Sequence, residues 1–161
     1  MKKIFTIVLL GAFCLVNAQA FKGKGDTKLG MGMTFQNGGT GIVASSDFGL
    51  GENISIGVLA SYLLGGSHIQ DVSSDYRFDV KARFNANLGS VLNLSPKFDV
   101  YPGLNLGLKN FGGHLGARYF FTDGFGIFTE FSVPFAKYDS EATSKYNNGS
   151  SFNIGAAFNL E

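Results

Sequence analysis

Charged residues recur at every second position along parts of this 161-residue chain. The clearest run is 76–88, where Arg77, Asp79, Lys81 and Arg83 alternate with aromatic and aliphatic residues. Charges at this spacing lie on one face of an extended strand, where they can pair with charges on neighbouring strands. Buried charges must be paired, because desolvating an isolated charge is costly. The spacing therefore favours a network of ion pairs enclosed by protein.

Other segments contribute to this candidate network. Arg118 and Glu130 flank the turn at 122–124 on diagonal positions, within reach of a long side chain. We predict an Arg118–Glu130 pair, extended by Arg83 and Asp99 on adjacent strands. The complete predicted network is Arg118, Glu130, Arg83, Asp99, Arg77, Asp79, Lys81 and Asp47. It fits either a neutralised plug or a gate on a narrow ion path, and the plug is favoured because eight strands leave no aqueous channel.

The two histidines are the candidates for catalysis or metal binding. A base needs a nucleophile beside it, and the neighbours of His114 offer no hydroxyl. His68 has Asp71 and Asp75 at irregular spacing, which makes a weak metal site. The chain has no phosphate-binding loop, dinucleotide fingerprint, zinc-protease motif or calcium loop. We therefore expect no catalytic residue, metal or cofactor, and His114 remains the one candidate base of an alternative lipid-modifying enzyme.

Composition and the N-terminus narrow the class of protein. A formal charge of +1 excludes a strongly basic nucleic-acid binder. Two lysines precede an apolar stretch at 4–16, and small residues follow it, which is the pattern of a secretory signal peptide. The stretch is too short to span a bilayer, which needs about 20 residues. We expect cleavage after Ala18, leaving 19–161 as one exported domain.

Beyond residue 20, apolar and polar residues alternate with a period of two, and no helical pattern occurs. Eight strands are predicted, at 27–35, 41–50, 54–62, 76–88, 97–109, 114–121, 125–135 and 152–160. Pro102 and Pro134 cannot donate to a ladder, so we expect an irregularity at each. One face of these strands carries no charged residue and no glycine, whereas the opposite face carries both. The longer connections, 64–75 and 136–150, fall at the same end.

Two architectures have this alternation. A transmembrane barrel turns its apolar face to lipid, whereas a soluble lipocalin-like carrier turns that face inward around an apolar ligand. Glycines on the charged face leave room for arginine and lysine side chains in a narrow interior. The bulky side chains of the apolar face would overfill the interior of an eight-stranded barrel. We predict an all-β, eight-stranded, antiparallel, up-and-down transmembrane β-barrel with a polar interior and an apolar exterior. The soluble carrier remains the alternative.

Aromatic residues bound the apolar face at both ends, as they do at lipid interfaces. The predicted girdles are Phe35, Tyr62, Tyr76, Phe135 and Phe152 at one end, and Phe48, Phe98, Phe121, Phe125 and Phe158 at the other.

The segment 112–131, GGHLGARYFFTDGFGIFTEF, is similar to a hairpin that recurs in outer-membrane barrel domains. Across the mature chain, the pattern resembles the small eight-stranded outer-membrane barrels of Gram-negative bacteria, of the OmpA membrane domain and OmpX type. This resemblance implies a monomeric integral outer-membrane protein that contacts lipid and, during biogenesis, the barrel-assembly machinery. It implies a structural or surface-interaction role with no open pore. The chain departs from the family by ending on Phe-Asn-Leu-Glu rather than on an aromatic residue, although the alternation continues to that point.

Overall fold

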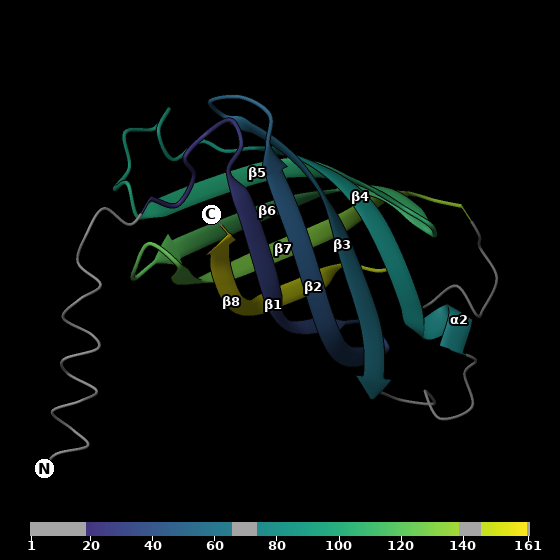
Figure 1. Cartoon of the computed structure of the whole chain (residues 1–161). Coiled ribbons are helices and arrows are strands. Elements are labelled where there is room, and N and C mark those ends of the chain that lie inside the picture. The colour runs from purple at the N-terminus through teal and green to yellow at the C-terminus, as the bar shows by residue number, and fades with distance from the viewer. Residues whose placement is uncertain (1–18, 66–73, 139–145, 161) are drawn as a thin grey trace, which may run out of the picture.

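The computed structural model describes residues 19–65, 74–138 and 146–160. Its strands are β1 (Thr27–Gln36), β2 (Gly39–Gly49), β3 (Ile54–Gly65), β4 (Phe78–Ala86), β5 (Phe98–Gly107), β6 (Asn110–Phe120), β7 (Phe125–Lys137) and β8 (Ser151–Leu160), with one short helix, α2 (Ser74–Arg77), before β4 (Figure 1). The predicted eight-stranded all-β fold is confirmed. Within the described ranges, no helix is both long enough and apolar enough to cross a membrane.

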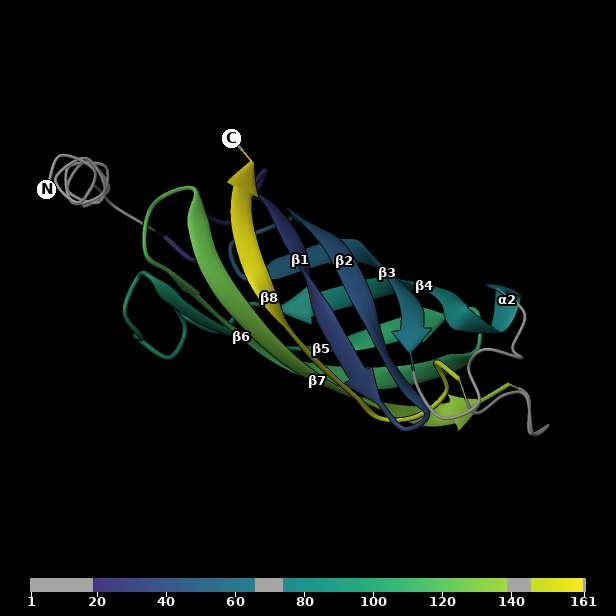
Figure 2. The same ribbon diagram turned by 90° about the horizontal axis from the view of Figure 1, so that it is seen from below.

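The sheet closes on itself. Each strand pairs antiparallel with the next one along the chain, and β1 pairs with β8 from Thr27 opposite Leu160 to Gln36 opposite Ser151. Figure 2 shows β8 beside β1, with α2 at the far end of the barrel from the C-terminus. Closure leaves no sheet edge, so the backbone hydrogen bonds are made within the barrel. We call the end at α2 the loop end and the opposite end the termini end.

The two faces of the strands have the predicted orientation. Met31 and Phe131 are 54% and 50% exposed on the outside, whereas Asp47, Arg83 and Glu130 are almost fully buried inside. The alternation of burial follows the same rule along each strand. A soluble carrier would show the reverse arrangement, with its apolar face enclosed. The barrel therefore presents an apolar wall around a charged lumen.

Pro102 and Pro134 each lie where a strand ladder is interrupted. The β6–β7 register shifts so that Phe111 faces Ala136 and Gly112 faces Pro134, which leaves Phe135 as an extra residue. The β4–β5 ladder joins only 81–85 to 103–107, and it stops next to Pro102. Proline has no N–H to donate, so it is accommodated at a bulge or beyond the end of a ladder.

The strand predicted at 76–88 begins two residues later, at Phe78. This later start changes the assignment of Arg77, one residue of the predicted network. Tyr76 and Arg77 form the last turn of α2. Arg77 donates from Nε to the carbonyl of Leu63, at 2.9 Å, and from Nη2 to that of Leu64, at 3.3 Å. The prediction that Arg77 belongs to the interior network is therefore wrong. It lies at the rim because it satisfies carbonyls at the end of β3.

The outward orientation of the apolar face can be tested at the centre of β7. We expect Phe131→Arg to destabilise the barrel in lipid vesicles by about 2–4 kcal/mol, because a charge on the lipid face near the midplane is poorly solvated. Phe131→Leu is the matched control and should unfold close to the wild type. The measurement is denaturant unfolding from vesicles. Equal stability of the arginine and leucine variants would show that this face does not meet hydrocarbon.

Candidate functional site

Arg83 lies at the centre of the charged lumen. Its Nε is 3.2 Å from Oδ1 of Asp47, and its Nη2 is 2.5 Å from Oε2 of Glu130. These three residues stand on β4, β2 and β7, and neither carboxylate comes from a strand that pairs with β4. The contacts therefore cross the lumen, and they hold together parts of the wall that share no backbone hydrogen bonds.

Arg118 on β6 organises a second group of contacts. Its Nη2 is 3.0 Å from Oδ2 of Asp99, and its Nη1 is 3.7 Å from Oδ2 of Asp47. It also donates to the side-chain oxygen of Asn87. Asp47 therefore contacts both arginines, and two guanidinium groups face three carboxylates in one connected network. A buried charge that lost its partners would carry the full cost of its desolvation.

Tyr101 occupies the space between the two arginines. Its ring centroid is 5.8 Å from Cζ of Arg83 and 4.6 Å from Cζ of Arg118, which are cation–π distances. Gly116 faces this ring, and a Cβ atom at that position would collide with it. The inward glycine provides the room that the alternating pattern predicted for it.

The predicted pairing of Glu130 is wrong, although the hairpin register is as expected. Arg118 is opposite Phe128 and Gly116 is opposite Glu130. Arg118 nevertheless turns to β5, where Asp99 is its direct cross-strand partner, and Glu130 takes Arg83 from across the lumen. Arg83 and Asp99 do extend the network, Arg83 through Glu130 and Asp99 through Arg118. The β4–β5 register places Arg83 opposite Asn105. Closure of a tilted barrel brings β4 near β7, and the hairpin alone contains no information about that approach.

The remaining predicted network residues form a separate pair nearer the loop end. Asp79 is fully buried, and its Oδ2 lies 3.7 Å from Nζ of Lys81. Lys81 also donates to Oδ1 of Asn110, at 3.4 Å. Among the ion pairs of the described residues, neither Asp79 nor Lys81 contacts Arg83, Arg118 or their carboxylate partners, so the predicted network is divided between two clusters.

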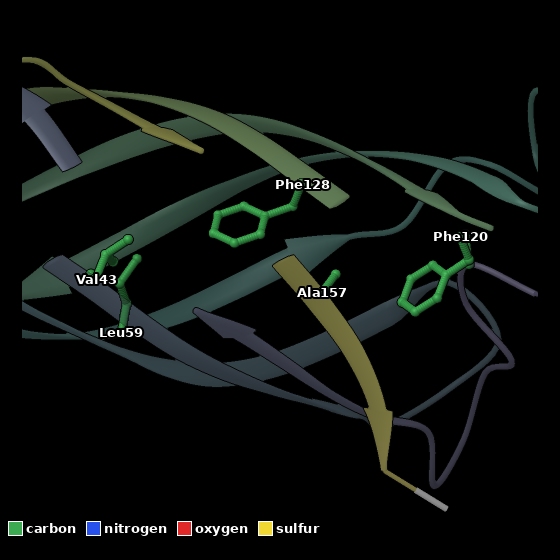
Figure 3. Packing of buried hydrophobic residues seen from close by; sticks show 6 residues of the cluster. Val43, Leu59, Phe120, Phe128 and Ala157 are labelled. Atoms are coloured by element: carbon green, nitrogen blue, oxygen red, sulfur yellow. The ribbon is translucent and has the colours of Figure 1, made fainter. Parts of the chain in front are cut away.

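Apolar side chains fill other parts of the lumen. Figure 3 shows Val43, Leu59, Phe120, Phe128 and Ala157 pointing into the barrel, and each of them is buried. At the termini end, Nζ of Lys28 lies 5.1 Å from the Phe120 ring centroid and 2.7 Å from Asp26. The charges and the aromatic rings together leave the interior packed.

The chain before β1 covers the termini end. Ala20 is 1% exposed and donates its backbone N–H to the carbonyl of Pro96. The Phe21 ring centroid lies 5.9 Å from Cζ of Arg118, so this ring sits against the second arginine of the lumen. The backbone of Gly25 donates to Gly49 at the end of β2. These contacts hold residues from outside the strands over this mouth of the barrel.

Asn147 covers the loop end. Its Oδ1 accepts hydrogen bonds from Gln36 and Ser61, and its Nδ2 donates to the carbonyls of Tyr76 and Arg77. The side chain thus joins β1, β3 and α2, and its backbone has a φ of 58°, a conformation that asparagine adopts more readily than most residues. Asn147 was not among the predicted site residues, although the Asn-Asn-Gly tripeptide at 147–149 is a turn signal that could have marked it.

His114 is buried in the lumen beside Arg83. Its Nε2 lies 2.8 Å from Oδ1 of Asn85 and 3.3 Å from Nη2 of Arg83, and its Nδ1 has no partner. The ring meets Tyr101 edge to face at 6.1 Å. Among the described residues, neither ring nitrogen hydrogen-bonds a hydroxyl or a thiol. Within 19–65, 74–138 and 146–160, no three His, Cys, Asp or Glu side chains group as a metal site, while His68, Asp71 and the Asp75 side chain lie outside the described part.

The aromatic residues predicted as girdles lie on the outer surface. Those with large exposed areas are Phe35, Phe48, Tyr76, Phe121, Phe125, Phe135 and Phe152, and those of intermediate exposure are Tyr62, Phe98 and Phe158. At the termini end, the Phe125 ring centroid lies 6.1 Å from that of Phe121 and 5.6 Å from that of Phe158, so three of these rings form a continuous cluster.

Comparison with known proteins agrees with this fold. A model of a family of unknown function, DUF6646, matches residues 11–160. No curated protein matches the chain. A solved structure from the de novo design of transmembrane β-barrels is 11% identical, with a TM-score of 0.58, covering 86% of this chain and 98% of its own. The N-terminal β-barrel domain of Pseudomonas aeruginosa OprF is 10% identical, with a TM-score of 0.56, covering 86% of this chain and 100% of its own. Both similarities concern the fold alone.

A double-mutant cycle distinguishes the two pairings of Glu130. We expect Arg83→Met and Glu130→Gln to show a coupling energy within about 0.5–3 kcal/mol, because the two side chains form a direct, buried pair. The coupling of Arg118→Met with Glu130→Gln should be smaller, because the ion pairs connect Arg118 to Glu130 through Asp47 and Arg83. Denaturant unfolding in lipid vesicles supplies the free energies, with Lys97→Gln as a control expected to lie within about 0.5 kcal/mol of the wild type. A larger coupling for the Arg118 pair would contradict the observed network.

Proposed function

We propose that this chain, which belongs to the family of unknown function DUF6646, is a monomeric integral β-barrel protein of the bacterial outer membrane. The observation that carries the proposal is the combination of an exposed apolar wall with a lumen of paired charges. An apolar wall of this extent is unstable in water, and a closed barrel satisfies its backbone without water. The fold resembles a designed transmembrane barrel and the OprF domain, which also suggests a membrane location.

The arrangement of the ends supports an orientation. Outer-membrane barrels have short turns on the periplasmic side and longer loops outside. Here the two longest separations between consecutive strands, from Gly65 to Phe78 and from Lys137 to Ser151, begin and end at the loop end, whereas β1 begins and β8 ends at the termini end. We place the termini end in the periplasm and the loop end at the cell surface. The signal peptide predicted at 1–18 lies outside the described residues and remains the proposed route of export, with the barrel-assembly machinery completing insertion.

The packing of the lumen supports a structural or surface-interaction role without an open pore. Arg83 and Arg118 are held by carboxylates from three strands, and Phe21 and Asn147 cover the two mouths. An ion entering the lumen would have to displace these partners. Contacts with other molecules are then made by the outer wall and by the surface connections.

The alternative of a lipid-modifying enzyme has less support. Its candidate base, His114, is 5% exposed and is enclosed by Asn85, Arg83 and Tyr101, so a lipid ester outside the wall does not reach it. A secreted carrier would need an apolar lumen, and this lumen carries the charges. We propose no catalytic residue and no cofactor.

The proposal predicts how the exported chain fractionates. After expression with residues 1–18 in a Gram-negative host, we expect it in the outer-membrane fraction and resistant to carbonate extraction. The folded barrel should migrate faster than the boiled chain on a cold detergent gel, because the closed sheet resists detergent unfolding. A water-soluble monomer, obtained without detergent from the periplasm or the medium, would refute the proposal.

A further inference from the structure

The outer wall contains an apolar groove that extends from β1 to β4. Its volume is about 350 Å³, within the usual range of ligand sites. Ile42, Tyr62 and Phe78 form a cross-strand row at the side nearer the loop end, and the smaller cross-strand pair Ala44 and Ala60 forms the floor beneath it. The groove exists because small side chains lie next to a row of large ones on a surface that we propose faces acyl chains.

A cation lies at the loop-end rim of this groove. Cζ of Arg77 is 5.0 Å from the ring centroid of Tyr62, which is one of the groove's walls. Figure 1 shows α2, which carries Arg77, next to the ends of β3 and β4. The two backbone bonds from Arg77 to Leu63 and Leu64 use two of the five N–H donors of a guanidinium group. None of the ion pairs between described side chains includes Arg77.

A second hollow on the outer wall provides a comparison. It has a volume of about 240 Å³ and is lined by Phe98, Tyr119, Ile127 and Ile154. None of the cation–ring contacts among the described residues involves its aromatic walls. The groove on β1–β4 thus combines two features, an apolar trough along the wall and a guanidinium held at its rim.

From this juxtaposition we infer that the groove is a binding site for a phosphate-bearing lipid of the surrounding leaflet, with one acyl chain over Ala44 and Ala60 and the phosphate on Arg77. This inference rests on the membrane function proposed above. A guanidinium matches a phosphate through parallel, charge-assisted hydrogen bonds, and it is already held in place here by Tyr62 and the end of β3. The occupant therefore needs both a phosphate with accessible oxygens and an acyl chain.

Native mass spectrometry of the folded barrel in a neutral detergent tests the site. The probes are dioleoyl phosphatidic acid, which presents a phosphate monoester, and dioleoyl phosphatidylcholine, which has the same acyl chains and a blocked phosphate. We expect the wild type to retain one phosphatidic acid with at least about tenfold preference, the effect of one charge-assisted hydrogen bond. Arg77→Gln should remove this preference, and Arg77→Lys should restore part of it.

Filling the trough separates the acyl contribution from the charge. Ala60→Phe should weaken retention of both lipids, whereas Ala82→Phe, on the outer wall away from the groove, should bind like the wild type. Lys137→Gln removes an exposed charge at the same end of the barrel and should preserve the preference. A preference that survives Arg77→Gln, or equal binding by the Ala60 and Ala82 variants, would overturn the site.

The gel-mobility shift of each preparation is recorded first. A folded barrel without lipid preference counts against this site alone. A wild-type chain that shows no folded band in detergent or lipid counts against the membrane function as well as the site.

Discussion

In hydrocarbon, every backbone N–H and carbonyl must find its partner within the protein, and in the membrane location that we propose this constraint determines the architecture. A sheet can meet it only by closing, so the chain pairs β8 with β1 along ten residue pairs. Closure then determines the environment of each side chain. Every second side chain faces outward, toward hydrocarbon in the proposed membrane location, and the others are enclosed in a narrow lumen.

The enclosed face creates the second problem, because charges in the lumen need partners. The solution is cooperative, since Asp47 contacts both Arg83 and Arg118 while Asp99 and Glu130 each hold one of them. These contacts connect strands that share no ladder. Burying such a network is not by itself stabilising compared with an apolar core, but removing one member leaves the others unpaired. The network therefore favours one arrangement of the wall.

The sequence predicted the strands and their faces because a period of two is a local property. Val43 and Phe128 illustrate this, since the pattern placed both on the inner face despite their apolar side chains, and both are buried there. The partners of Glu130 could not be predicted, because the approach of β4 to β7 depends on closure and tilt. Arg77 continued the alternation in the sequence, yet it lies at the rim because the last carbonyls of β3 provide acceptors there. Asn147 follows a long polar segment, and its contacts depend on where that segment returns to the barrel.

The central claim is that hydrocarbon surrounds the apolar face while the charged face is sealed. A spin-label scan of β8 in lipid vesicles tests it most directly, with accessibility measured to oxygen, which partitions into lipid, and to a water-soluble nickel complex. We expect labels at Phe152, Ile154 and Ala156 to relax with oxygen and not with nickel, and labels at Asn153 and Ala157 to be protected from both. Nickel accessibility at the outward positions would show that water surrounds the barrel and would contradict the account.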